Sequence, residues 1–311
     1  MKKLICLFLA ICAFSVFGCG GNESGSEQVK GKFATVIDAA GRTVALDKKP
    51  ERVVALNPSY LNMIDSVDGK VIGRATSKLV DLPESMQNVP EIGFVYNINM
   101  ESLIGLQPDL VLAGKNQHEK FVPLLESNNI KVIELDAKTY DDVKDTVKLL
   151  GKIYGTEDKA DAECRLLDQE IEAVLKKIPE QKKHIVIMHA TASSVTVEGE
   201  KSIAGCVSNI LGFENVALAK MQNKGDKVPY SMEALVEQNP EIIFITSMGK
   251  AEEIENRLRS DFKNNPAWAS LEAVKNGRVY VLPEKLFLLN PGLNYPEAVE
   301  YMAKQVYPEV F

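Results

Sequence analysis

Cysteine, histidine and tryptophan are all scarce in this chain of 311 residues, which contains five, three and one of them. So few cysteines exclude a disulfide framework, and three histidines are few for a dedicated zinc or manganese site. Beyond residue 18, no apolar run reaches the ~20 residues that a transmembrane helix needs. The first predicted strand is not followed by G-x-G-x-x-G, and neither G-x-S-x-G nor H-E-x-x-H occurs. The absence of these three motifs argues against an enzyme.

Positive charge is in the minority, with 36 Lys and Arg against 43 Asp and Glu. The net charge of −7 becomes −9 once the two lysines of residues 1–18 are removed with that segment. An acidic surface argues against nucleic-acid binding and against an electrostatic contact with a membrane.

The N-terminal segment is typical of a secretory signal: two lysines, about 14 apolar residues, and a small residue at position 18. The residues Val-Phe-Gly before Cys19 resemble the bacterial lipobox, whose cysteine is lipidated and becomes the new N-terminus, although phenylalanine stands where a small residue is usual. Residues 19–33 have the composition of a flexible tether. We expect a signal peptide at 1–18 and a lipid anchor at Cys19, on the extracytoplasmic face of the cytoplasmic membrane. An ordinary signal cleaved near Gly18 is the alternative.

Only two cysteines belong to the mature domains. Cys6 and Cys12 leave with the signal and Cys19 takes the lipid, so Cys164 and Cys206 remain. They are most simply buried thiols, and one bridge between them stays possible.

Two pairs of segments repeat at one offset. MESLIGLQPDLVLAG (100–114) and MEALVEQNPEIIFIT (232–246) share Met-Glu-x-Leu, then Pro and an acid, then an apolar run, 132 residues apart. RVVALNPSY (52–60) and HIVIMHATA (184–192) repeat at the same offset. Two unrelated pairs at one offset predict an internal duplication. The alternative is that α/β units simply look alike.

Each half alternates short aliphatic runs with helical stretches, which is typical of parallel strands covered on both faces. Residues 156–178 place apolar residues at helical spacing, and about 20 residues at 1.5 Å each make a rod near 30 Å long. We therefore predict an α/β fold of two similar lobes with Rossmann-like parallel sheets, at 34–155 and 180–311. One long helix at 156–179 would join them, with a ligand cleft between them and little freedom to tilt.

Ligands of open α/β sheets bind beyond the carboxyl ends of the strands. The side chains at these ends are aromatic, amide and basic, with a methionine and a histidine, and they suit a bulky amphipathic ligand better than a small sugar or ion. The candidate ligand-binding residues are Ser59, Tyr60, Arg74, Lys78, Tyr96, Asn97, Lys115, His189, Tyr230, Met248 and Phe287.

A run of segments carries a family resemblance: RVVALNPS, PEIGFVYNINMESLIGLQPDLVLAG, the linking helix, LGFENVA, NPEIIFI and WASLEAVKNGRVYVLP. In this order they resemble the substrate-binding proteins of ABC importers for iron-siderophores, haem and cobalamin, the helical-backbone class. The resemblance covers residues 34–311. It implies no catalysis and no intrinsic cofactor: such a protein captures its cargo outside the cytoplasmic membrane and presents it to a permease driven by an ATPase. We also expect a monomer.

The resemblance implies an iron complex as cargo, either a ferric siderophore or haem, with cobalamin as the alternative. Arg74, Lys78 and Lys115 would meet an anionic siderophore. For haem, Tyr96 lies in the loop where some haem-binding relatives place their first-lobe iron ligand, and Met248 or His189 would serve from the other lobe. Free Mn²⁺ or Zn²⁺, which needs three or four converging His and carboxylate ligands, is a further alternative. So are a two-lobed periplasmic enzyme and an adhesin.

Two positions depart from the family pattern. Members usually carry one acidic residue per lobe that pairs with permease arginines, and this chain has Asn62 and Cys206 there. Asp65 and Glu214 are acids that could substitute for them.

Overall fold

The computed structural model describes residues 32–311 apart from 219–226, 230, 250, 260–261 and 263–264. The signal, Cys19 and nearly all of the 19–33 tether therefore lie outside the described residues, as does the candidate Tyr230. None of the described helices combines the length and the apolar composition that crossing a membrane requires.

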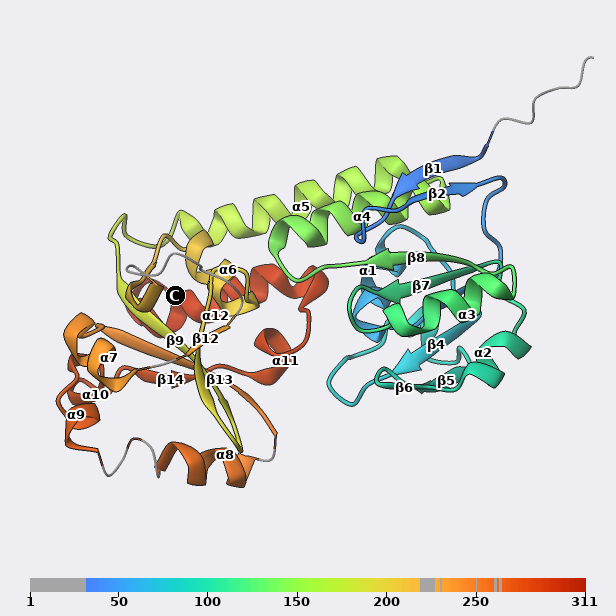
Figure 1. The fold of residues 1–311 in the computed structure, drawn as a ribbon. Coiled ribbons are helices and arrows are strands. Elements are labelled where there is room, and N and C mark those ends of the chain that lie inside the picture. Colours follow the sequence, from blue (N-terminus) through green and yellow to red (C-terminus); the bar gives the residue numbers. More distant parts are fainter. Residues whose placement is uncertain (1–31, 219–226, 230, 250, 260–261, 263–264) are drawn as a thin grey trace, which may run out of the picture. The chain divides into compact units, whose positions relative to one another are not determined.

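The first half of the chain folds around a six-stranded sheet in the order β6-β5-β4-β3-β7-β8 (Figure 1). All of its strands run parallel except β6, which returns antiparallel to β5. Their bounds are β3 Val53–Ala55, β4 Gly73–Thr76, β5 Glu91–Phe94, β6 Asn97–Ile98, β7 Leu110–Gly114 and β8 Lys131–Leu135. A separate hairpin precedes them, formed by β1 (Ala34–Ile37) and β2 (Thr43–Leu46).

Helices cover both faces of this first sheet. Alternate strand residues pack into two different apolar clusters, because successive side chains of a strand point to opposite faces. One face is covered by α1 (Leu61–Ser66) and α4 (Tyr140–Tyr154), and the other by α2 (Met100–Gly105) and α3 (Val122–Ser127). The strands β3, β7 and β8 are therefore buried aliphatic runs, as the sequence predicted.

The second half is built around a sheet in the order β12-β10-β9-β13-β14, with β11 also paired to β9. Its strands are β9 His184–Thr191, β10 Val195–Glu198, β11 Glu214–Asn215, β12 Lys227–Pro229, β13 Ile242–Met248 and β14 Val279–Val281. One face packs on α6 (Ile203–Ile210), α11 (Glu284–Phe287) and α12 (Tyr295–Val306). The other face packs on α7 (Met232–Gln238), α8 (Ala251–Leu258), α9 (Pro266–Ala269) and α10 (Glu272–Lys275).

The strand register of the two sheets matches the repeat offset of 132 residues. In the first sheet Val53 lies opposite Leu110, and in the second sheet the residues 132 positions later, Ile185 and Ile242, lie opposite each other. The third parallel strand, β8 or β14, then joins the same side of the sheet. The two copies diverge on the other side of the central strand, where β4 is parallel to β3 but β10 is antiparallel to β9.

One long helix, α5 (Glu157–Leu175), connects the two halves (Figure 1). It packs along α4 and α12 and buries the residues that the helical spacing marked, Ala160, Cys164, Leu167, Ile171 and Val174. The predicted fold class, two α/β units joined by one long helix, is therefore confirmed.

The two cysteines of the mature domains do not pair. Cys164 and Cys206 are both free thiols. Cys164 is buried on α5, whereas Cys206 on α6 is half-buried and lies 3.4 Å from the amide nitrogen of Tyr140. The bridge that the sequence left open is therefore absent.

Helix α4 begins with a capping box that offers a test of local stability. The Thr139 side chain accepts a hydrogen bond from the amide of Asp142 at 3.2 Å, and the Asp142 carboxylate accepts one from the amide of Thr139 at 2.9 Å. Because two otherwise free amides are satisfied, we expect Thr139→Ala to lower the free energy of unfolding by about 1 kcal/mol. Chemical denaturation checks this, and Thr139→Ser should restore most of the loss. An unchanged midpoint for the alanine variant would contradict the role of the cap.

Candidate ligand-binding surface

Contacts join the segments that follow the carboxyl ends of strands in the two halves. Gly292, beyond α11, packs so closely on Ser59 that a Cβ placed on it would lie 3.3 Å from the Ser59 carbonyl oxygen. Lys285 Nζ lies 2.6 Å from Asp81 Oδ2. Ser59 and Asp81 follow β3 and β4, and Lys285 and Gly292 follow β14. Segments that follow β3 and β4 in the first half are therefore in contact with the segment that follows β14 in the second, and open α/β sheets bind ligands beyond such strand ends.

Five of the predicted ligand residues have exposed side chains at these strand ends. Tyr96, in the turn between β5 and β6, is 70% exposed, and Met248, the last residue of β13, is 51% exposed. Lys78, Asn97 and Lys115, near the ends of β4, β5 and β7, are exposed as well. A phenol, a thioether, an amide and two amines are thus free to meet a ligand.

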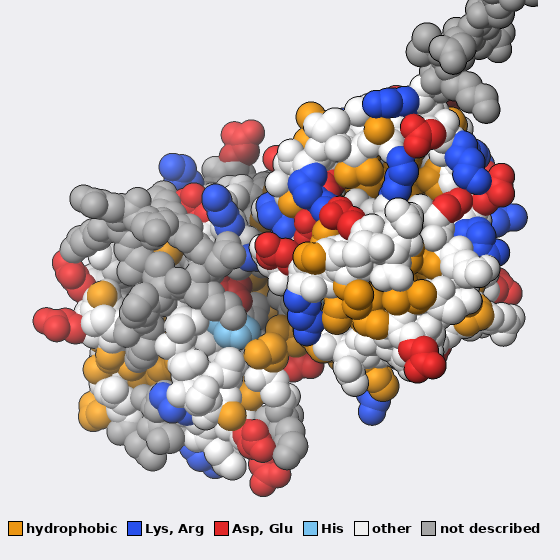
Figure 2. All heavy atoms as spheres, turned by 45° about the vertical axis from the view of Figure 1, so that its right-hand side comes forward, with side chains coloured by type: hydrophobic (Ala, Val, Ile, Leu, Met, Phe, Trp, Pro, Cys, Tyr) orange, Lys and Arg blue, Asp and Glu red, His pale blue; other side chains and the backbone are white. Residues whose placement is uncertain are grey.

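Sequence analysis missed one aromatic side chain of this surface. Phe94, the last residue of β5, is 52% exposed and stands two positions before Tyr96. The β5 burial pattern alternates, with Ile92 buried, so an apolar residue at the outward position was the available signal. On the face of the molecule drawn in Figure 2, apolar side chains lie among interspersed acidic and basic ones, and the described residues form no extended basic patch there.

Lys115 has acidic neighbours that partly offset its positive charge. It shares a cavity of about 220 Å³ with Asp136, Asp142 and Asp145. Burial, with repulsion from Asp142, raises the pKa of the Asp136 carboxyl, while attraction to Lys115 opposes that rise. The lysine therefore attracts an anionic ligand less strongly than an isolated amine would.

Three of the remaining candidates lie inside the protein. The Tyr60 hydroxyl donates to the Leu135 carbonyl oxygen at 2.9 Å, and burial raises the pKa of Tyr60 far above its ordinary value. Phe287 is buried and meets the edge of the Tyr301 ring. Ser59 is buried in the turn after β3, where its amide donates to the Asn57 side chain. These residues shape the strand ends from within.

Arg74 is a buried cation in β4. Its guanidinium donates to the carbonyl oxygens of Met86 and Gln87 and lies 3.1 Å from the Glu91 carboxylate. Its Nη1 is buried and has no partner among the described residues. Arg74 therefore holds the segment before β5 against β4, and we leave it out of the ligand surface.

His189 belongs to a buried polar network in the second sheet. Its Nδ1 lies 2.9 Å from Thr246 Oγ1 and 3.3 Å from Glu198 Oε1, and the Thr246 hydroxyl donates to the same carboxylate oxygen at 2.6 Å. Strand register produces the network, because Thr246 on β13 lies opposite His189 on β9, and Glu198 is on the neighbouring β10. The Nε2 of His189 and the Oε2 of Glu198 have no partner among the described residues.

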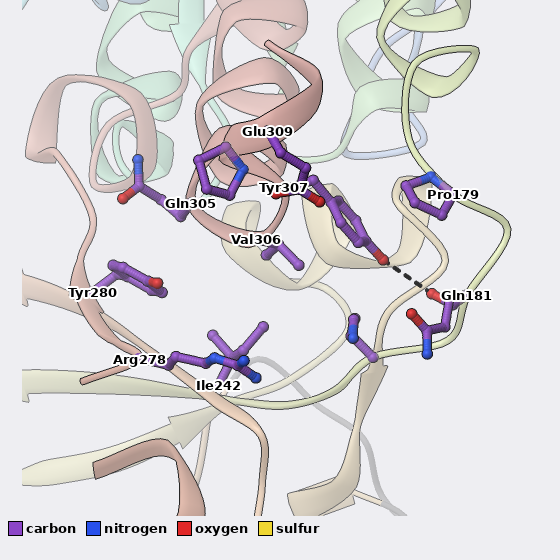
Figure 3. Close-up of a pocket in the computed structure, with 11 residues that line it drawn as sticks. Pro179, Gln181, Ile242, Arg278, Tyr280, Gln305, Val306, Tyr307 and Glu309 are labelled. Carbon is purple, nitrogen blue, oxygen red and sulfur yellow. Dashed lines mark hydrogen bonds between the residues drawn. The ribbon is translucent and has the colours of Figure 1, made fainter. Parts of the chain in front are cut away.

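Two further cavities lie at the opposite edges of the sheets, where parallel strands begin. One, of about 380 Å³, is bounded by Lys183, Ile242 and Arg278 at the starts of β9, β13 and β14 (Figure 3). There the Tyr307 hydroxyl donates to the Gln181 carbonyl oxygen at 3.2 Å and fastens the C-terminal turn. The other, of about 560 Å³, lies between α1 and the start of β4. Neither has a predicted ligand residue among its walls.

The described residues offer few groups that could hold a free metal ion. No three His, Cys, Asp or Glu side chains among them gather in a way that could bind one. Of the iron ligands considered from the sequence, Tyr96 and Met248 stand singly at their strand ends, and His189 is buried in the network with Thr246 and Glu198.

Comparison with known proteins gives matches over nearly the whole chain. The model of the family described as "Periplasmic binding protein" matches residues 53–286. The chain is 26% identical to the ABC transporter substrate-binding lipoprotein YvrC of Bacillus subtilis, over 100% of this chain and 99% of YvrC. It is 28% identical to the Fe(3+)-citrate-binding protein YfmC of the same organism, over 100% and 98%. The crystal structure of Staphylococcus aureus IsdE complexed with heme superposes with a TM-score of 0.71 at 25% identity, over 82% of this chain and 98% of IsdE.

Proposed function

Because the chain belongs to the periplasmic binding protein family, we propose that it captures an iron complex, a ferric siderophore or haem, outside the cytoplasmic membrane and delivers it to an ABC importer. It is a binding protein and not an enzyme. The single observation that carries the proposal is the full-length similarity to a protein named for ferric citrate binding. The fold shared with a haem-bound protein supports the same class of cargo.

The exposed strand-end side chains are the contacts that we propose for the cargo. A tyrosine phenolate and a methionine thioether both serve as axial ligands of haem iron, so Tyr96 and Met248 suit haem from the two halves. The rings of Phe94 and Tyr96 offer flat apolar walls, and Lys78 and Lys115 would meet carboxylates of a chelate or of haem propionates. In our proposal, this surface is supported from inside the protein by five buried side chains: Ser59, Tyr60, Arg74, His189 and Phe287.

We infer that Cys19 anchors the protein by lipid to the outer face of the cytoplasmic membrane, and that a permease with its ATPase receives the cargo. A polar tether and a family relative named as a lipoprotein support the anchor. Asp65 and Glu214 are exposed acids that follow the two unusual docking positions in the sequence. Each already has a partner within the protein: Asp65 accepts a hydrogen bond from Ser85, and Glu214 lies near His184. Docking through them would therefore exchange an internal contact for one with the permease. We also infer that the protein acts as a monomer.

Titration tests the proposed cargo. The mature chain, monitored by tryptophan and tyrosine fluorescence, should bind either haem or a ferric chelate such as ferric citrate saturably at one site per chain. The absorbance of protein isolated from its own host would then identify the complex, because haem, ferric catecholates and corrinoids have distinct spectra. Saturable binding of cobalamin in place of the iron complexes would overturn the choice of cargo. A folded sample that binds none of them would overturn the proposed function.

A further inference from the structure

His118 connects two loops of the first half through its imidazole. The side chain is buried, at 1% exposure, immediately beyond β7. Its Nδ1 lies 2.9 Å from the amide nitrogen of Gly114, and its Nε2 lies 2.8 Å from the carbonyl oxygen of Val95. An amide can only donate and a carbonyl can only accept, so these partners assign the neutral tautomer with the proton on Nε2. Both ring nitrogens are then satisfied.

The two loops have no other direct link in the sheet. In the strand order, β4 and β3 lie between β5 and β7, so no backbone ladder joins the end of β5 to the end of β7. The imidazole spans that gap. Val95, its acceptor, directly precedes Tyr96, and Gly114, its donor, directly precedes Lys115. The Val95 amide also donates to the Thr76 carbonyl oxygen at 3.0 Å, which ties the same turn to the end of β4.

We propose that His118 is a positioning residue for the ligand surface: its neutral imidazole holds the Tyr96 turn at a fixed distance from Lys115, and protonation of the ring releases the turn. This inference rests on the proposed function, because it assigns a role toward the cargo. His118 need not touch the cargo, since it acts through the backbone of Val95.

Protonation would break the arrangement for a geometric reason. An imidazolium carries a hydrogen on Nδ1, which would face the hydrogen of the Gly114 amide, and that amide would lose its acceptor. Burial lowers the pKa of His118, the bond to Val95 opposes this, and the nearby Lys120 cation lowers it further. The Tyr60 hydroxyl, beside Gly114, is the titratable group that faces this corner from the segment after β3, and its raised pKa keeps it neutral.

The sign of the pH effect follows from the lowered pKa. An unfolded chain or a released loop takes up a proton near the ordinary histidine pKa of about 6.5, whereas the ordered loop resists protonation to lower pH. The held conformation therefore loses stability as the pH falls below about 6.5. Cargo affinity should fall over the same range.

Two substitutions of His118 each keep one of its two hydrogen bonds and remove the other. In His118→Gln the amide nitrogen can take the place of Nε2 and keep the bond to Val95, whereas in His118→Asn the amide oxygen can take the place of Nδ1 and keep only the bond to Gly114. We expect the Gln variant to bind haem or ferric citrate within about 3-fold of the unaltered protein at pH 7.5, and the Asn variant about 10-fold more weakly. His184→Gln, at an exposed histidine of the second half, is the matched control and should change nothing.

The pH profile distinguishes positioning from a merely structural role. Affinity is measured from pH 7.5 to 5.5 for the unaltered protein and for each variant. Dividing the affinity of a variant by that of the unaltered protein at the same pH removes the effect of any titration of the cargo itself. The unaltered protein and His184→Gln should lose affinity with acid about 5- to 10-fold more than His118→Gln does. Should the Asn variant fail to fold, the Gln variant alone decides: loss of the pH slope supports the inference, and an unchanged slope overturns it.

A measurement without cargo keeps this inference separate from the proposed function. Imidazole nitrogen NMR should show His118 with an unprotonated Nδ1 and a protonated Nε2 at pH 7.5, and amide exchange at residues 95–97 should be faster in the Asn than in the Gln variant. If the unaltered protein binds no iron complex, the proposed function fails while these data still decide the positioning role. If cargo binds but the unaltered protein and the two His118 variants share one affinity, one pH slope and one exchange pattern, the role of His118 is overturned.

Discussion

Glu198→Ala should lower the free energy of unfolding by about 3 kcal/mol, although Glu198 lies in no predicted site. The carboxylate is buried and accepts the Thr246 hydroxyl at 2.6 Å, with His189 Nδ1 at 3.3 Å from the same oxygen. Its removal takes away the short acceptor of the Thr246 hydroxyl, which keeps only the Met188 carbonyl oxygen at 3.4 Å, and leaves His189 Nδ1 with Thr246 alone. A lost buried partner costs about 1–3 kcal/mol. A small side chain would also leave a void under the sheet.

Chemical denaturation of three variants checks this prediction. Glu214→Ala, which removes an exposed carboxylate of the same half, is the control and should change stability by less than about 0.5 kcal/mol. Glu198→Gln keeps the shape and one acceptor oxygen, so it should lie between the control and the alanine variant. A loss below about 1 kcal/mol for Glu198→Ala would mean that the network contributes little to folding.

The role of His189 in this network could not be predicted from the sequence. The position of His189 near the end of an aliphatic strand suggested a ligand contact, because a polar residue there often faces a ligand. Its partners lie 9 and 57 residues away along the chain, and only the pairing of β9 with β10 and β13 brings them to it. Periodicity reports which positions are buried but not which strands become neighbours.

The features that could be predicted are those encoded within one repeat. The aliphatic runs and the helical spacing of residues 156–178 are local patterns, and the 132-residue offset relates segments that take equivalent places in the two sheets. The antiparallel pair β9 and β10 was not predicted, because the segment 195–198 was not identified as a strand. The three residues between the two strands are too few for the crossover that parallel strands need. At the strand ends, sequence spacing found Tyr96 and Met248 on the surface, but also Tyr60 and Arg74, which turn inward to backbone acceptors.

Replacing both Tyr96 and Met248 by alanine should weaken binding of the preferred iron complex at least 100-fold, or about 2.7 kcal/mol. The two side chains stand at strand ends of different halves, so each would contact the cargo from its own side. We expect each single replacement to cost about 10-fold and the two to combine nearly additively, since the side chains share no partner. Both are more than half exposed, so folding stability should stay within about 0.5 kcal/mol of the unaltered protein.

Haem and ferric citrate titrations of the single and double variants measure this loss, with Leu166→Ala, at an exposed apolar residue of α5, as the matched control. Tyr96→Phe then separates two kinds of contact. If the phenolate ligates haem iron, this variant should shift the Soret and charge-transfer bands, because it removes the oxygen and keeps the ring. If the ring only stacks on a chelate, the affinity should stay within about 3-fold. A double alanine variant that binds as tightly as the unaltered protein would place the cargo away from these strand ends, since loss of both exposed anchors cannot leave a shared contact surface intact.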